Sequence, residues 1–196
     1  MRSKALVIVD VQQAFEDNKW GNRNNILAED NIRKILSLWR NTENPVIYIQ
    51  HQSDDPNSLF HPENKGFGIK DIVRPKKGEP IFTKKVNSGF IGTNLEAYLH
   101  EKNITDVVIT GLTTAHCVST TTRMSGNLGF NTFLISDAIA TYGLTDQNGT
   151  YHNAEQIHEL TLATLHDEFA TILSTEELIK EFKLEKRFSE NVTRNT

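Results

Sequence analysis

Short apolar runs alternate with longer amphipathic stretches along most of the chain. Runs rich in valine, isoleucine and leucine are typical of strands that are buried on both faces of a sheet. The chain contains six such runs: Lys4–Val9, Pro45–Gln50, Pro80–Thr83, Asp106–Thr110, Asn131–Ser136 and Phe169–Leu173. We therefore predict six strands.

The stretches between these runs carry apolar residues at helical spacing, for example Ile32, Ile35 and Leu36. The spacing predicts helices at Asn25–Trp39, Thr93–Glu101, His116–Leu128 and Asn153–His166, and a last helix that begins at Thr175. The segment from His51 to Glu79 contains three prolines and three glycines. We expect an irregular excursion there, because both residue types interrupt regular structure.

Alternating strands and helices predict right-handed crossovers and a mainly parallel sheet covered on both faces. The expected fold class is α/β, a Rossmann-like three-layer α/β/α sandwich with a six-stranded sheet. We see no internal repeat and no boundary between domains, so we treat residues 1–196 as a single domain. Ligand sites in open sheets of this kind lie beyond the carboxyl ends of the strands.

Composition and charge narrow the classes of function. Hydrophobic residues make up 37% of the chain, and the formal net charge is -4, so there is no basic field to attract nucleic acid. No apolar run approaches the roughly 18 residues that cross a bilayer. A single cysteine cannot form an internal disulfide. We expect a cytoplasmic protein that binds a small molecule, with neither nucleic acid nor membrane as partner.

Three reactive side chains follow three separate predicted strands. Asp10 ends the first strand, Lys84 follows the third, and Cys117 lies at the start of the helix after the fourth. Each has an ordinary explanation, as a turn former, a surface lysine or a small buried residue. Because the strands are expected to be parallel, the three side chains should meet at one edge of the sheet.

These residue types suit nucleophilic catalysis. A thiol with a pKa of about 8.5 becomes a better nucleophile in positive potential, which the helix N-terminus and Lys84 would supply. Asp10 would take the thiol proton and return it to the leaving group. Backbone N–H groups between Thr113 and Cys117 would receive the oxyanion.

Three segments resemble the isochorismatase-like cysteine hydrolase superfamily, which includes nicotinamidases. They are ALVIVDVQQAF (5–15), TKKVNSGFIGTNLEAYL (83–99) and VVITGLTTAHCVSTTTRMSGNLGF (107–130). The resemblance implies the strand order 3-2-1-4-5-6 and a homo-oligomer, either a dimer or a tetramer. It also implies the triad Asp10, Lys84 and Cys117, and a cis peptide bond between Leu112 and Thr113. That bond would aim the N–H groups of Thr113 and Cys117 at the oxyanion.

The resemblance places Phe15 near the substrate pocket, and Trp20 in the following loop is a candidate for the pocket wall. Nicotinamidases carry an aspartate–histidine metal cluster after the second strand, but this chain has His51 there without the expected aspartate. We therefore expect no metal and no cofactor, with His51 at the surface or in the pocket wall. His116, beside the cysteine, is expected to have a packing or surface role.

The leading hypothesis is hydrolysis of a small amide, or a related C–N bond, through a thioester on Cys117. A second hypothesis is cleavage of a vinyl ether with Asp10 as acid, as in true isochorismatases. A third is a non-catalytic binding or redox-responsive protein on the same fold.

Overall fold

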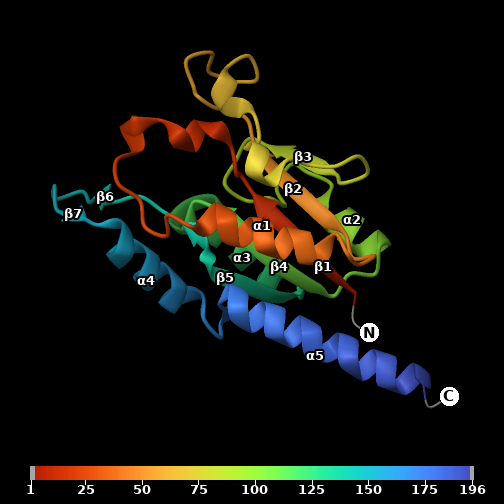
Figure 1. Ribbon diagram of the computed structural model, residues 1–196. Coiled ribbons are helices and arrows are strands. Elements are labelled where there is room, and N and C mark those ends of the chain that lie inside the picture. Colours follow the sequence, from red (N-terminus) through yellow and green to blue (C-terminus); the bar gives the residue numbers. More distant parts are fainter. Residues whose placement is uncertain (1–2, 195–196) are drawn as a thin grey trace.

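The computed structural model describes residues 3–194, with side chains up to Leu184 (Figure 1). Its centre is a six-stranded sheet in the order β3-β2-β1-β4-β5-β8, and all neighbouring strands in it are parallel. The strands are β1 (Lys4–Val9), β2 (Val46–His51), β3 (Ile81–Lys84), β4 (Asp106–Leu112), β5 (Asn131–Ala140) and β8 (Thr171–Leu173). The six predicted strands and their predicted order are therefore confirmed.

Helices cover both faces of the sheet, as the three-layer prediction requires. Alternate residues of β1 point to opposite faces, so Leu6 and Ile8 pack in one core cluster while Val7 and Val9 pack in another. The first cluster includes residues of α1 (Ala28–Trp39) and α5 (Thr175–Arg194). The second includes residues of α2 (Leu95–Glu101) and α4 (Ala154–Leu165), and α3 (Ser119–Asn127) packs on the same side.

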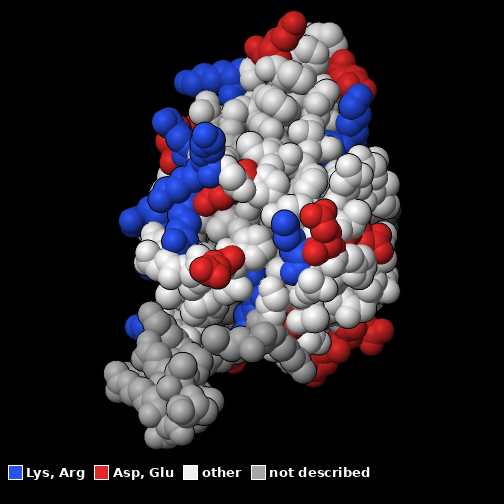
Figure 2. All heavy atoms as spheres, turned by 90° about the vertical axis from the view of Figure 1, so that its right-hand side faces the viewer, with Lys and Arg blue, Asp and Glu red and all other residues white. Residues whose placement is uncertain are grey.

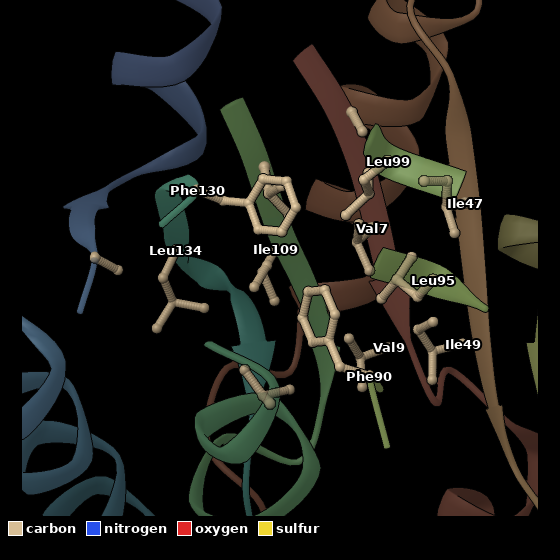
Figure 3. Packing of buried hydrophobic residues seen from close by; sticks show 14 of the residues in the cluster. Val7, Val9, Ile47, Ile49, Phe90, Leu95, Leu99, Ile109, Phe130 and Leu134 are labelled. Atoms are coloured by element: carbon tan, nitrogen blue, oxygen red, sulfur yellow. The ribbon is translucent and has the colours of Figure 1, made fainter. Parts of the chain in front are cut away.

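Figure 3 shows the second cluster from close by. Val7, Ile47 and Ile109 come from three neighbouring strands, and Val7 and Ile47 lie beside Leu95 and Leu99 of α2. All five side chains are completely buried. The apolar runs of the sequence therefore form strands whose two faces are both shielded from water, and this rigid centre fixes where the strand ends lie.

The structure differs from the prediction in several elements. An antiparallel pair, β6 (Leu144–Thr145) and β7 (Tyr151–His152), was not predicted. Strand β5 continues to Ala140 after a register shift against β4, whereas the prediction ended at Ser136. Helix α1 begins at Ala28 rather than Asn25, because Asn25 has a φ of 41° and its amide donates to two backbone carbonyls of β5.

The excursion after β2 is irregular, as expected, and it folds back over the carboxyl edge of the sheet. It contains the short 3-10 turns η3 (Lys65–Phe67) and η4 (Asp71–Val73). The loop after β1 contains two more, η1 (Gln13–Glu16) and η2 (Asn18–Trp20). The buried Gln12 amide joins the two segments by donating to the carbonyl oxygens of His51 and Phe67, at 3.0 Å and 2.9 Å.

The surface carries charges of both signs. On the face in Figure 2, basic and acidic side chains lie next to one another in several places, with uncharged surface around them. Within residues 3–194, no helix is both long and apolar enough to cross a membrane.

Candidate active site

Asp10, Lys84 and Cys117 meet at the carboxyl edge of the sheet. Asp10 directly follows β1, Lys84 is the last residue of β3, and Cys117 lies just after β4. The Lys84 Nζ is 2.6 Å from the Asp10 Oδ2 and 3.2 Å from the Cys117 Sγ. The sequence predicted this meeting from parallel strands alone. It did not predict that the lysine and the carboxylate would be almost completely buried, each with 1% of its surface exposed.

The Lys84 ammonium has a third partner, His51, at the end of β2. The distance from Lys84 Nζ to His51 Nδ1 is 3.1 Å. Burial, followed by the charge of Lys84, lowers the pKa of His51 to about 4, so the imidazole is neutral at pH 7 and its Nδ1 accepts. An ammonium group has three N–H donors. Each one therefore has an acceptor, and the position of Lys84 is fixed.

The ligand atoms of Asp10, His51 and Cys117 lie within 4.8 Å of one another, a spacing that could hold a metal ion. The Lys84 Nζ is within hydrogen-bond distance of all three groups, so its positive charge already fills the position that a cation would take. These residues therefore do not fit a resident metal while Lys84 is in place. Asp54, further along the excursion, pairs instead with the exposed Lys85.

The electrostatics of Cys117 differ from the expectation. We expected positive potential to favour the thiolate, but burial, followed by the charge of Asp10, raises the pKa of Cys117 to about 12 against the opposing effect of Lys84. The resting thiol is therefore protonated. Burial also raises the pKa of Asp10, although Lys84 opposes this. A carboxylate with a raised pKa is a stronger base, which suits it to accept a proton at neutral pH.

Cys117 lies in a π-helical turn, η5 (Thr114–Val118), and not at the start of a regular helix. The peptide bond between Leu112 and Thr113 is cis, as the resemblance implied. The Thr113 carbonyl accepts from the N–H groups of His116 and Val118, at 3.1 Å and 3.2 Å. The predicted helix over His116–Leu128 is therefore divided, and the regular helix α3 begins only at Ser119.

Two histidines hold this turn. The buried His158 on α4 bonds through Nδ1 to the Thr114 Oγ1 at 3.1 Å. The His116 Nδ1 is 3.1 Å from the Thr113 Oγ1. His116 is exposed, in agreement with the expected surface role, and it also lines the cavity in front of Cys117.

A cavity of about 370 Å³ opens in front of the thiol. Its aromatic walls include Phe15 and Trp20, the two predicted pocket residues, together with Phe60 of the excursion and Tyr142 after β5. The ring centroids of Phe15 and Phe60 are 5.3 Å apart, and those of Phe15 and Trp20 are 5.5 Å apart. The other lining residues are Asp10, Lys19, His51, Asn87, Thr113, His116, Cys117, Thr141, Gly143 and Leu144.

Hydrogen bonds to the backbone fix the aromatic walls. The Trp20 Nε1 donates to the Ala14 carbonyl at 2.7 Å, and the Tyr142 hydroxyl donates to the Phe15 carbonyl at 2.7 Å. Sequence reasoning missed Asn87, whose Oδ1 is 3.7 Å from the Cys117 Sγ. Its position three residues after Lys84, inside a segment already compared with the family, was the available signal.

The open parallel sheet with helices on both faces defines a doubly wound α/β protein. A carboxylate, an ammonium and a thiol lie together at the carboxyl ends of its strands, which makes this edge of the sheet a candidate catalytic site. Residues 4–177 match the model of the Isochorismatase domain. The chain is 68% identical over 179 residues to the isochorismatase family protein YrdC of Bacillus subtilis (strain 168), covering 91% of this chain and 96% of that protein. It belongs to the isochorismatase family of hydrolases.

Two further similarities agree with this assignment. Ureidoacrylate amidohydrolase RutB of Rhizobium rhizogenes is 26% identical over 208 residues, covering 86% of this chain and 82% of that protein. The crystal structure of an isochorismatase-family protein from Chromobacterium violaceum ATCC 12472 has a TM-score of 0.89 and 36% identity. That comparison covers 92% of this chain and 95% of the other.

Proposed function

We propose that this protein hydrolyses a small amide, or a related C–N bond at a carbonyl carbon, through a thioester on Cys117. The observation that carries the proposal is the contact of the Lys84 ammonium with both the Asp10 carboxylate and the Cys117 sulfur at the end of a cavity. A relative that is named an amidohydrolase supports the choice of a C–N bond.

In the first half-reaction, Asp10 takes the thiol proton as the Cys117 Sγ attacks the carbonyl carbon. The new C–S bond pushes the carbonyl electron pair onto oxygen, and the backbone N–H groups of Thr113 and Cys117 receive the oxyanion. One such donor contributes about 3 kcal/mol in other enzymes. When the tetrahedral intermediate collapses, Asp10 gives its proton to the leaving nitrogen, and ammonia or an amine departs.

In the second half-reaction, Asp10 takes a proton from water, and the resulting hydroxide attacks the thioester. The C–S bond breaks, the carboxylic acid forms, and the sulfur recovers its proton from Asp10. Since the resting thiol is neutral, proton transfer accompanies attack in this scheme and no stable thiolate precedes it. Lys84 keeps Asp10 ionised and stabilises negative charge on the sulfur as it develops.

The cavity suits a small substrate with a flat or apolar body. Phe15, Trp20, Phe60 and Tyr142 form its aromatic walls. The polar groups of Asp10, His51 and Asn87 lie near the Cys117 sulfur. A few polar groups at one end of an apolar cavity fix the orientation of a ligand. We infer that the amide group lies against Cys117 and that the rest of the substrate lies between the aromatic rings.

Mass spectrometry of the intact protein, quenched during turnover of a panel of small primary amides, tests the mechanism. We expect an acyl adduct on Cys117, and we expect Cys117→Ala to abolish both the adduct and the hydrolysis. If Cys117→Ala instead cleaves a vinyl ether while Asp10→Asn does not, Asp10 acts as an acid without a nucleophile. An acyl adduct on another residue would also contradict the proposal.

A further inference from the structure

We propose that His51 bridges the catalytic lysine and the substrate. Its Nδ1 holds Lys84 between Asp10 and Cys117, and its Nε2–H binds a second hydrogen-bond acceptor of the substrate, next to the carbonyl that is attacked. The proposal rests on the proposed function and deepens it, because it defines the amides that the site prefers.

The sheet itself aligns the two side chains. His51 and Lys84 are register partners on the neighbouring parallel strands β2 and β3, so both side chains leave the sheet on the same side. Their nitrogen atoms are 3.1 Å apart. Lys84 does not line the cavity, whereas His51 does. The imidazole therefore connects the buried ammonium with the space that the substrate would occupy.

The position of the imidazole is itself fixed. The Gln12 side chain bonds to both backbone groups of His51: Oε1 accepts from the N–H at 2.8 Å, and Nε2 donates to the carbonyl at 3.0 Å. The ring of Phe60 meets the imidazole edge-to-face, with centroids 5.2 Å apart. A catalytic group is effective when such contacts restrict its motion.

The location of the imidazole proton follows from the neighbouring charge. An ammonium has only donors, so the Nδ1 that faces Lys84 must accept and the proton must be on Nε2. Among the side chains that the structure describes, none bonds to this Nε2, although His51 lines the cavity. The site therefore offers an unused donor to whatever binds beside Cys117.

This donor defines a substrate class. The attacked carbonyl oxygen goes to the backbone N–H groups, so His51 needs a different acceptor within the same small molecule. Amides that carry a second carbonyl or carboxylate oxygen close to the scissile bond supply one. A donor that is left without a partner in a buried site costs binding energy, and this penalises amides that lack the second oxygen.

Two variants of His51 separate its two contacts. His51→Asn keeps an acceptor near the former Nδ1 but has no donor at the former Nε2, and His51→Leu removes both. Two amides of similar shape are compared, malonamide with a second carbonyl and 3-methylbutanamide without one. The control is His61→Asn, which changes a histidine of the same excursion that does not line the cavity.

We expect His51→Leu to lower kcat for both amides by about 100-fold, because Lys84 loses its third partner. We expect His51→Asn to retain kcat within about threefold and to raise KM about tenfold for malonamide only. His61→Asn should match the parent protein. Equal KM values of parent and His51→Asn for malonamide would overturn the contact with the substrate.

Alkylation of Cys117 by iodoacetamide across pH tests the contact with Lys84 without any hydrolysis. We expect the pH profile of the alkylation rate to shift in His51→Leu and to return towards that of the parent in His51→Asn. Such a shift together with no hydrolysis of any amide would refute the proposed function but retain the bridge to Lys84. A profile unchanged in His51→Leu would overturn the bridge, whatever the hydrolysis assays show.

Discussion

Burial sets the charges of the individual site residues. Asp10 and Lys84 are each 1% exposed, and the carboxylate depends on the ammonium to remain ionised. The Oδ2 of Asp10 contacts Lys84, but its other carboxyl oxygen, Oδ1, has no hydrogen-bond partner in the described part of the chain. A buried carboxylate with so few partners takes up a proton readily once its cation is removed.

Lys84→Met therefore should inactivate the protein and change how its stability depends on pH. Without Lys84, burial raises the pKa of Asp10 still further above its unfolded value. Folding then favours the protonated form over a wider pH range. Stability falls as pH rises above about 4, by up to about 1.4 kcal/mol per pH unit, and the variant continues to lose it above the pH at which the Asp10 carboxyl of the parent ionises. Urea unfolding at pH 5 and pH 8, with amidase assays, measures both effects.

The neighbouring lysine provides the control for this prediction. Lys85 is exposed and pairs with the exposed Asp54, so Lys85→Met should change stability by less than about 0.5 kcal/mol at both pH values. A Lys84→Met variant with the same loss of stability at pH 5 and pH 8 would show that Asp10 does not depend on Lys84 for its charge.

Lys19 lines the cavity, and no residue of the triad offsets its positive charge. Asp10 is offset by Lys84, and burial lowers the pKa of both His51 and His116, which keeps these histidines neutral. The Lys19 Nζ lies 4.8 Å from the centre of the Trp20 ring. A cation at the cavity wall should attract anionic substrates and disfavour cationic ones.

We expect Lys19→Met to raise KM about fivefold for malonamate, which carries a carboxylate, and less than twofold for neutral malonamide. Steady-state kinetics with the two compounds measures the difference. Equal changes for both would mean that Lys19 shapes the cavity without contributing charge recognition.

At the scale of elements, Gly111 allows β1 and β4 to approach each other closely. Its φ is 126°, and a Cβ at this position would lie 2.0 Å from the Val9 carbonyl oxygen. Gly111→Ala should therefore destabilise the protein by more than about 2 kcal/mol and displace the turn that carries Cys117. Urea unfolding and the rate of thiol alkylation measure these effects.

Gly78 is a matched control, because its φ is 94° but no atom lies within 4 Å of an added Cβ. Gly78→Ala should bear only the backbone strain, about 1 kcal/mol. If the two alanine variants lost the same stability, the contact with Val9 would not be what requires glycine in β4.

The sequence predicted those elements whose apolar residues recur in a regular pattern. The strands of the central sheet were found because both of their faces are buried, and the triad followed from where those strands end. The pair β6 and β7 has two residues in each strand and no apolar alternation to mark it. The turn η5 was missed because a single π-helical turn does not change the spacing of apolar residues enough to be recognised in the sequence. The contact of His51 with Lys84 depends on strand register, which the pattern did not provide.

At the scale of the whole molecule, a buried group of charges joins the two segments that cover the site. Glu29 of α1 binds Arg23 in the loop after β1, and its Oε1 accepts from Lys70 of the excursion at 2.9 Å. Glu29 is 9% exposed and Lys70 is 8% exposed. The ion pairs of Glu29 therefore connect the two segments that supply the cavity walls, although these segments are distant in the sequence.

Acid should weaken the ion pairs of Glu29. Burial opposes ionisation of Glu29, but its bonds to Arg23 and Lys70 outweigh burial and lower its pKa from 4.5 to about 2. A lowered pKa means that its stabilising contribution is complete above pH 4.5 and is lost as pH falls towards 2. Glu29→Gln should cost about 3 kcal/mol at pH 7 and flatten the acid limb of the stability curve.

Thermal unfolding followed from pH 7 to pH 2 measures this limb, with Glu43→Gln, at an exposed position, as the control. The control should follow the parent curve. An acid limb of equal steepness in Glu29→Gln and the parent would mean that other groups govern the loss of stability.

The complete enclosure of Lys84 has a consequence for the effect of dissolved salt. Mobile ions weaken attraction between charges that water can reach, with a screening length of about 8 Å at 0.15 M, but they cannot enter between Asp10 and Lys84. Turnover of a neutral amide should thus be almost the same in dilute and concentrated sodium chloride. The advantage of malonamate over malonamide, which depends on a lysine at the cavity wall, should decline steadily as sodium chloride is added.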